Sequence, residues 1–294
     1  MSVAVVIPTL NAEKQLNSLL TMLGKQTVLP DDILIIDSSS DDHTVSVAEA
    51  YSNVRIKQIP RETYNHGRTR DLGVQQTVGD VILFFTQDAV PADEKLIEYL
   101  LSSVQDPNVA AAYARQVPRE DSSPREKLVR AYNYPPKSRQ QSANDIHNLG
   151  IKAFFCSNVC AAYRRDVYET LGGFEKDLLS NEDMIYAAHA IRNGYRIAYV
   201  ADAEVIHSHD LSLREQYRRN LVQGYEIARH QELLGNISSS REGFHMLKAV
   251  ALPLLKQGRY ISVLGLTADC AARYLGSQSG KKQYKTSVRK EATI

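Results

Sequence analysis

Short apolar runs alternate with amphipathic stretches in the first part of the chain. Four runs rich in β-branched side chains are typical of buried strands and lie at residues 3–7, 33–36, 54–59 and 81–85. Between them, residues 44–51 and 68–77 predict helices, and Asn11 stands at the expected N-cap of a first helix. Strands that alternate with helices predict an α/β fold with a mostly parallel sheet flanked by helices.

The middle of the chain breaks this pattern. Residues 115–148 are rich in Pro, Ser, Arg, Gln and Asn, which predicts a long loop that binds a substrate or covers a site. Periodic positions return with a helix expected at residues 182–193 and a strand at residues 195–200. We therefore assign residues 1–210 to one α/β domain.

The last part of the chain is helical in pattern and basic in charge. Residues 216–234 and 246–255 predict amphipathic helices with Arg and Lys on their polar sides, and the polar end from Ser277 predicts disorder. Residues 211–294 hold about 14 Lys and Arg against about 6 Asp and Glu, an excess of about +8. Because the whole chain carries +1, about −7 is left for the rest.

This helical extension has two interpretations. Lys and Arg beside Leu, Val and Tyr suit peripheral contact with an anionic membrane. The alternative is a helical bundle that packs on the first domain or on a second copy in a homodimer. The pattern favours neither interpretation over the other.

Composition and cysteine usage limit the class of protein. With a net charge of +1, nothing in the whole chain favours a nucleic-acid partner. The cysteines Cys156, Cys160 and Cys270 show no paired spacing, which argues against a disulfide framework and fits a reducing cytosol. The N-terminus lacks the basic start of a signal peptide, and no apolar run reaches the roughly 18 residues of a membrane span. We expect a cytoplasmic protein, either soluble or at the inner face of the cell membrane.

Polar side chains follow three strands of the predicted sheet. They are Asn11 after the first strand, residues 37–42 after the second, and Thr86, Gln87 and Asp88 after the fourth. Ligands of such sheets bind outside the carboxyl ends of the strands. Three polar strand ends together therefore predict a binding site rather than unrelated turns.

Five short motifs in a fixed order resemble those of the family 2 glycosyltransferases, which have the Rossmann-like GT-A fold. They are V-V-I-P-T-L-N at residues 5–11, I-I-D-S-S-S-D-D at 35–42, N-H-G-R-T-R-D at 65–71, T-Q-D-A at 86–89 and N-E-D at 181–183. The resemblance spans residues 3–210. The segments Y-N-H-G-R-T-R, T-Q-D-A and H-S-H-D are similar to those of the rhamnosyltransferase branch, which builds bacterial surface polysaccharides.

The resemblance implies transfer of a sugar from a nucleotide-sugar donor to an acceptor hydroxyl. The acceptor must lose a proton to a base, and the family pattern assigns that role to Asp183, with inversion at the anomeric carbon. Neighbouring Glu182 points about 100° away on a helix, so both acids cannot face one acceptor. The donor pocket implied by the resemblance comprises Thr9, Asn11, Asp37, Ser39, Arg70, Gln87 and Asp88.

A divalent cation is the expected cofactor, because the leaving diphosphate develops negative charge. Mg²⁺ and Mn²⁺ take oxygen ligands, and Asp88 stands where the family has its D-x-D motif. Thr86 replaces the first Asp of that motif, which leaves a single carboxylate at this place. His207 and His209 are the candidates to complete the site, with His207 favoured because it directly follows a strand-like run.

Several alternatives remain open at the level of sequence. Resemblance to the rhamnosyltransferase branch implies dTDP-rhamnose as donor and a polysaccharide or lipid-linked oligosaccharide as acceptor, with a UDP-hexose as the alternative donor. A nucleotidyltransferase is disfavoured because Pro8, Thr9, Leu10 and Asn11 include neither Gly nor Lys to hold a triphosphate. An inactive nucleotide-binding scaffold is the third alternative.

Overall fold

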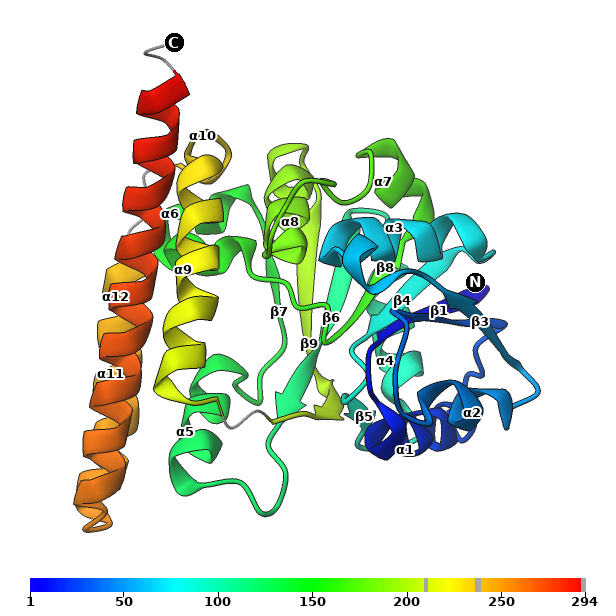
Figure 1. Cartoon of the computed structure of the whole chain (residues 1–294), viewed down its shortest axis with the longest axis horizontal. Helices are drawn as coiled ribbons and strands as arrows, with labels where there is room; N and C mark the ends of the chain where they lie inside the picture. The colour runs from blue at the N-terminus through cyan, green and yellow to red at the C-terminus, as the bar shows by residue number, and fades with distance from the viewer. Residues whose placement is uncertain (209–210, 236–238, 292–294) are drawn as a thin grey trace.

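A single mixed sheet forms the centre of the computed structural model, which describes residues 1–208, 211–235 and 239–291 (Figure 1). Its order is β3-β2-β1-β4-β8-β6-β9-β5, and β7 also pairs with β9. The strands are β1 (Val3–Thr9), β2 (Asp32–Asp37), β3 (Val54–Gln58), β4 (Val81–Phe85), β5 (Val90–Pro91), β6 (Val109–Val117), β7 (Arg139–Gln141), β8 (Cys160–Arg164) and β9 (Arg196–Ile206).

Most strands of this sheet share one direction. β1 to β4 are mutually parallel, β6 and β9 are parallel to each other, and β8 joins the two groups as an antiparallel strand. β6 and β9 therefore run the same way as β1, while β5 and β7 oppose them. The mixed, mostly parallel sheet expected from the sequence is confirmed, and the carboxyl ends of six strands meet at one edge.

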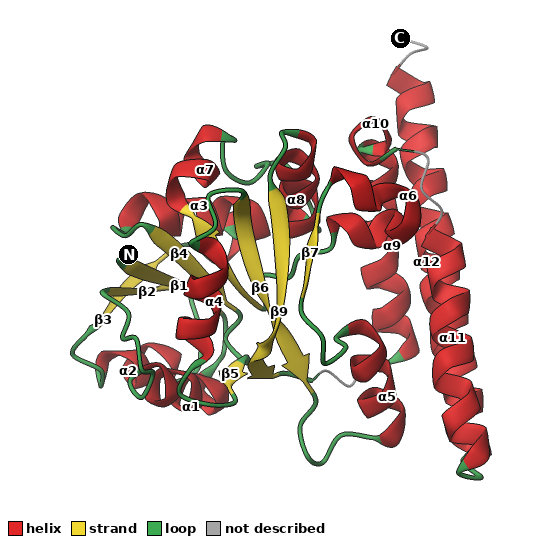
Figure 2. Cartoon of the chain, turned by 180° about the vertical axis from the view of Figure 1, so that it is seen from behind, coloured by secondary structure: helices red, strands yellow, loops and turns green. Residues whose placement is uncertain are grey.

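Helices cover both faces of the sheet (Figure 2). They are α1 (Glu13–Leu23), α2 (Thr44–Glu49), α3 (His66–Gln76), α4 (Leu96–Val104), α5 (Pro124–Asn133), α6 (Ile146–Leu149), α7 (Arg165–Thr170), α8 (Glu182–Arg192), α9 (Leu213–Arg229), α10 (Gln231–Leu234), α11 (Ser239–Lys256) and α12 (Tyr260–Glu291). α1, α2 and α4 share one core with Val5 of β1, whereas α3, α7 and α8 share a second core with Val6. Successive side chains of a strand point to opposite faces, so each buried strand supplies both cores.

The predicted N-cap at Asn11 is wrong. α1 begins after Ala12, and no side chain caps it. Asn11 instead has a φ of +52°, in the left-handed region that asparagine tolerates better than most residues. Its Oδ1 accepts a hydrogen bond from the Asp41 backbone N–H at 2.9 Å. The residue therefore ties the loop after β1 to the loop after β2.

The long loop expected at residues 115–148 is also wrong, because that segment contains the end of β6, helices α5 and α6, and strand β7. Local signals for α5 are present in the sequence: Ser123 accepts a hydrogen bond from the Glu126 N–H, and Pro124 opens the first turn. Val129 is the only fully buried side chain of α5. Leu128 and Tyr132 of α5 also pack but stay partly exposed, so the apolar face is short and its periodic pattern is weak.

The C-terminal helical extension is present, and α9 and α12 run side by side along one edge of the molecule (Figure 1). The disorder expected from Ser277 is wrong as far as Glu291, because α12 continues to that residue. Among the described residues, no helix is long and apolar enough to cross a membrane. The division into residues 1–210 and 211–294 stays a prediction.

Glycines explain why the polar end of the chain stays helical. A Cβ atom on Gly276 would overlap the Tyr217 carbonyl oxygen of α9, and one on Gly280 would overlap that of Leu221. The two helix backbones therefore approach more closely than any larger residue allows. This packing, invisible to helical periodicity, holds α12 against α9.

The substitution Gly280→Ala tests this packing. It should lower the free energy of unfolding by about 1–3 kcal/mol, because overlap with the α9 backbone outweighs the better helix propensity of alanine. Gly243→Ala in α11 is the matched control, since a Cβ there meets no atom and should be neutral or stabilising. Urea unfolding of both variants measures the difference; equal midpoints would contradict the close packing of α9 on α12.

Candidate active site

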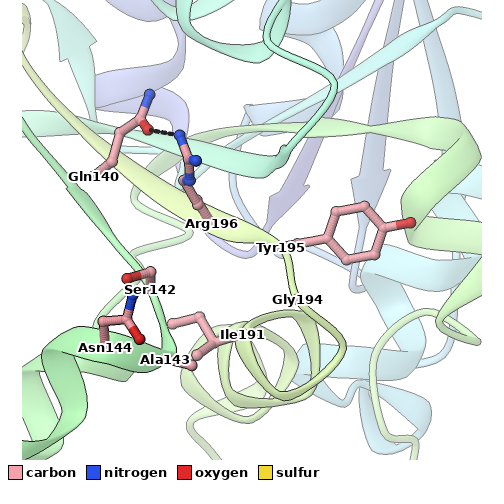
Figure 3. Close-up of a pocket in the computed structure, with 8 residues that line it drawn as sticks. All are labelled: Gln140, Ser142, Ala143, Asn144, Ile191, Gly194, Tyr195 and Arg196. Carbon is pink, nitrogen blue, oxygen red and sulfur yellow. Dashed lines mark hydrogen bonds between the residues drawn. The ribbon is translucent and has the colours of Figure 1, made fainter.

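A cavity of about 480 Å³ lies among β-strand ends, α3, α5, α8, α9 and α12. Its walls include three of the predicted donor, metal and catalytic residues, namely Arg70, Asp183 and His207. A second cavity of similar volume lies elsewhere on the surface, between β7 and the turn before β9 (Figure 3). There Arg196 donates to Gln140 at 3.1 Å, but none of the predicted site residues lines it. The first cavity is therefore the candidate site.

The loops after β1 and β2 are joined by a buried carboxylate. Asp37 is fully buried, and its Oδ1 accepts a hydrogen bond from Thr9 Oγ1 at 3.1 Å. Its Oδ2 accepts from the Ser40 N–H at 2.9 Å. In this structure Asp37 and Thr9 hold the two strand ends together, and their predicted contact with the nucleotide stays a prediction.

Three more of the predicted donor residues lie in these loops or contact them. Gln87 receives a hydrogen bond from the Leu10 N–H at 2.7 Å and returns one to the Leu10 carbonyl at 3.1 Å. Ser39 has a φ of +57° and donates its hydroxyl to the Ile59 carbonyl at 2.8 Å. With Asn11, these side chains shape the edge of the sheet beside the cavity rather than the cavity wall.

His207 and Asp88 connect these loops to the cavity. His207 is buried directly after β9, and its Nε2 lies 3.5 Å from Asp88 Oδ2. Gln116 accepts a hydrogen bond from Arg130 on Oε1, and this identifies the amide oxygen because arginine only donates. The same oxygen lies 2.9 Å from His207 Nδ1, so Nδ1 carries the hydrogen. The lone pair of a neutral His207 is therefore on Nε2 and faces a carboxylate.

Two acceptor atoms facing each other are unfavourable unless a proton or a cation lies between them. A histidine that donates Nδ1–H to an oxygen and presents Nε2 is the usual arrangement of a metal ligand. At the same place the buried Thr86 Oγ1 forms no hydrogen bond with the described residues. Among the described residues, no group of three or more His, Cys, Asp and Glu side chains could hold a metal ion. The cation site at Asp88 and His207 therefore stays a prediction, and a cation held there would take its other ligands from substrate and water.

His209 lies outside the described residues. Its predicted part in metal binding, as an alternative or companion to His207, stays a prediction.

Arg70 and Glu182 form a buried ion pair in the wall of the cavity. Their side chains are 4% and 7% exposed, and Arg70 Nη1 lies 3.2 Å from Glu182 Oε1. Asn158 donates to the same oxygen at 3.0 Å. Burial acts to raise the pKa of Glu182, but the charges of Arg70 and His66 and the hydrogen bond from Asn158 together outweigh it, so the pKa is lowered. Glu182 is therefore a charged partner of Arg70, and both side chains line the cavity.

Asp183 faces the cavity and has a different environment. Its Oδ2 accepts from the Asn158 N–H at 3.1 Å and its Oδ1 from the Met184 N–H at 2.8 Å. Burial, and then the negative charge of Glu182, raise the pKa of Asp183 to about 7. Asn181 precedes the helix and makes no side-chain cap bond. A carboxylate with such a pKa takes up and releases a proton near neutral pH.

Comparisons with known proteins decide the family. The profile described as Glycosyl transferase family 2 matches residues 4–172. The chain belongs to this family. It is 39% identical to the O-antigen chain rhamnosyltransferase RfbN of Salmonella typhimurium, over 96% of this chain and 90% of that protein. It is 38% identical to WbaN of Salmonella anatum, which has the same description, over 95% of this chain and 89% of that protein.

Solved structures agree with the fold of this glycosyltransferase. The mannosyltransferase PcManGT from Pyrobaculum calidifontis, solved with GDP-Man and Mn²⁺, matches with a TM-score of 0.58 and 18% identity. The match covers 99% of this chain and 79% of that one. The GT-A fold expected from the sequence is therefore confirmed.

The tertiary structure adds cavity residues of the glycosyltransferase that sequence reasoning missed. Arg130 of α5, Arg219 of α9 and Arg273 of α12 line the same cavity. Burial, followed by the nearby charge of Arg273, lowers the pKa of Arg219. Arg130 and Arg273 form ion pairs with Glu126 and Asp269 at 2.7 and 2.8 Å, so part of this positive charge is balanced within the chain. The three guanidinium groups are nevertheless donors suited to an anionic ligand. No local motif marks these residues, because they come from three distant helices.

Proposed function

We propose that this glycosyltransferase moves rhamnose from dTDP-rhamnose to an acceptor hydroxyl with inversion at the anomeric carbon. The observation that carries the proposal is similarity along almost the whole chain to two O-antigen chain rhamnosyltransferases. The acceptor in this proposal is a growing cell-surface polysaccharide or a lipid-linked oligosaccharide. The site of action in this proposal is the cytoplasm, at the inner face of the membrane.

Asp183 is the general base in this mechanism. Its carboxylate accepts the proton of the acceptor hydroxyl while the acceptor oxygen attacks the anomeric carbon and the nucleoside diphosphate leaves. Support comes from its place in the cavity wall and from its pKa of about 7, which makes it an effective base near neutral pH. Glu182 is engaged by Arg70, so one acid is available, as a single displacement requires.

The proposed cation site comprises Asp88 and His207. A bound cation supplies positive charge that stabilises the leaving diphosphate. An imidazole ligand favours Mn²⁺ over Mg²⁺, because Mg²⁺ is the harder ion and prefers oxygen. Gln116 keeps the Nε2 lone pair of His207 aimed at Asp88. Arg130, Arg219 and Arg273 add the positive charge that draws a diphosphate into the cavity.

The donor is tested by the thermal stability of the chain with dTDP, dTDP-rhamnose, UDP, UDP-glucose and UDP-galactose, each with and without Mn²⁺ or Mg²⁺. A ligand that binds the folded state adds RT ln(1 + [L]/Kd), about 2.7 kcal/mol at 100 times its Kd. We expect the largest shift from dTDP-rhamnose with Mn²⁺. Asp88→Asn should remove the metal-dependent part of that shift and leave the melting temperature of the unliganded chain nearly unchanged.

Each other outcome identifies an alternative. A larger shift with a UDP-hexose would name that sugar nucleotide as donor, and a shift without transfer to any acceptor would support an inactive scaffold. A nucleoside triphosphate that outcompetes every sugar nucleotide would support a nucleotidyltransferase. Absence of any nucleotide effect would contradict the proposed function altogether.

A further inference from the structure

The turn between α11 and α12 carries a group of exposed apolar side chains. We define the hairpin tip as residues 252–264, which join the end of α11 to the start of α12. Its exposed large apolar residues are Leu252, Leu255, Tyr260, Ile261 and Leu264. Single exposed apolar residues are ordinary on protein surfaces, but a contiguous group marks a contact site.

The outward apolar residues are separate from those that hold the hairpin in place. Met246, Val250 and Leu254 of α11 are buried and pack with Val129 of α5 and Leu266 of α12. Leu252 and Leu255 lie near the opposite side of α11, because each residue turns the helix by about 100°. A helix that is apolar on both sides is expected to be covered on both. The buried side of α11 is already covered by α5 and α12 of the same chain.

The charged residues of the tip segment itself are of one sign. Residues 243–268 contain Lys248, Lys256 and Arg259 and no Asp or Glu. All three cations are exposed. Basic side chains that flank an apolar group match an anionic lipid surface, where the apolar groups enter the interface and the cations meet headgroups. A contact between two such tips would instead bring like charges together.

The tip also lies at the end of the molecule toward which β6 and β9 run (Figure 1). Arg273 lines the cavity, and Ile261 lies twelve residues earlier on the same helix, about 18 Å along its axis. Close packing through Gly276 and Gly280 fixes α12 on α9, which also contributes to the cavity wall. Anchoring the tip in a membrane therefore fixes the distance of the cavity from the membrane surface and its orientation toward it.

We propose that the hairpin tip inserts into an anionic lipid surface and presents the cavity to a membrane-borne acceptor. This inference rests on the proposed function for the acceptor, but the lipid contact itself is tested without turnover. It assigns membrane contact to one short segment rather than to the basic extension as a whole.

The experiment is flotation of the full chain with phosphatidylcholine vesicles, either pure or mixed with phosphatidylglycerol. Wild type should float with the anionic vesicles, and Ile261→Glu should bind them at least about tenfold more weakly, a loss of about 1.4 kcal/mol. Val78→Glu is the matched control, since Val78 is 83% exposed and Ile261 86% exposed. Leu264→Glu repeats the test at a second exposed position of the tip.

Melting temperature and dTDP binding, measured for every variant, separate lipid contact from folding and from the proposed function. Unchanged dTDP binding with lost flotation supports the tip as the membrane contact. Equal flotation of Ile261→Glu and wild type, or no flotation of wild type, overturns the inference even when dTDP binds. A wild-type dimer in sedimentation that Ile261→Glu dissociates also overturns it, because the tip is then covered by a second copy.

Discussion

Replacement of Asp183 by asparagine should lower kcat by about 10²–10⁴-fold while the affinity for the sugar nucleotide changes little. A general base acts mainly in the transition state, so its loss affects turnover more than ground-state binding. Asparagine keeps the size of the side chain and its acceptor toward the Asn158 N–H, but cannot take a proton. Steady-state transfer rates and calorimetric donor binding measure the two quantities separately.

The pH profile of the wild type provides the control. Because the pKa of Asp183 is raised to about 7, the rate should fall as the pH drops below that value and the carboxylate becomes protonated. The residual activity of Asp183→Asn should lack this acidic limb. Near-normal turnover in Asp183→Asn, or an unchanged acidic limb, would show that another group takes the proton.

The buried pair of Arg70 and Glu182 predicts the largest effect on stability. Arg70→Met should lower the free energy of unfolding by about 3–5 kcal/mol, because it leaves the Glu182 carboxylate buried without its cation. The lowered pKa of Glu182 means that its contribution is present above the ordinary value of 4.5 and is lost as the pH falls through the lowered pKa. Urea unfolding at neutral pH measures the loss.

A double variant separates this structural role from donor binding. Arg70→Met combined with Glu182→Leu replaces the pair by apolar side chains of similar size and should recover much of the lost stability. Arg70 also helps to lower the pKa of Asp183, so Arg70→Met should move the acidic limb of the rate to higher pH. If Arg70→Met weakened dTDP binding without loss of stability, Arg70 would instead act on the nucleotide, as the sequence suggested.

Local sequence predicted the frame of the molecule. β-branched runs marked β1 to β4, and motif order indicated the family, because strand burial and short loop motifs depend on neighbouring residues. Prediction from local sequence failed where the periodic pattern is weak or where the contact joins residues far apart in the chain. α4 and β6 were passed over, and α5 was taken for loop because only Val129 of that helix is fully buried.

The tertiary structure alone decided how the site is assembled. Arg70 meets Glu182 across more than a hundred residues of chain, and Gln116 of β6 orients His207 at the end of β9. The three arginines of the cavity wall come from three helices, and α12 packs along α9 because glycines let the two backbones approach. None of these contacts has a local period or motif. Periodicity reports only which face of an element is buried; the partner on that face is set by packing of the whole chain.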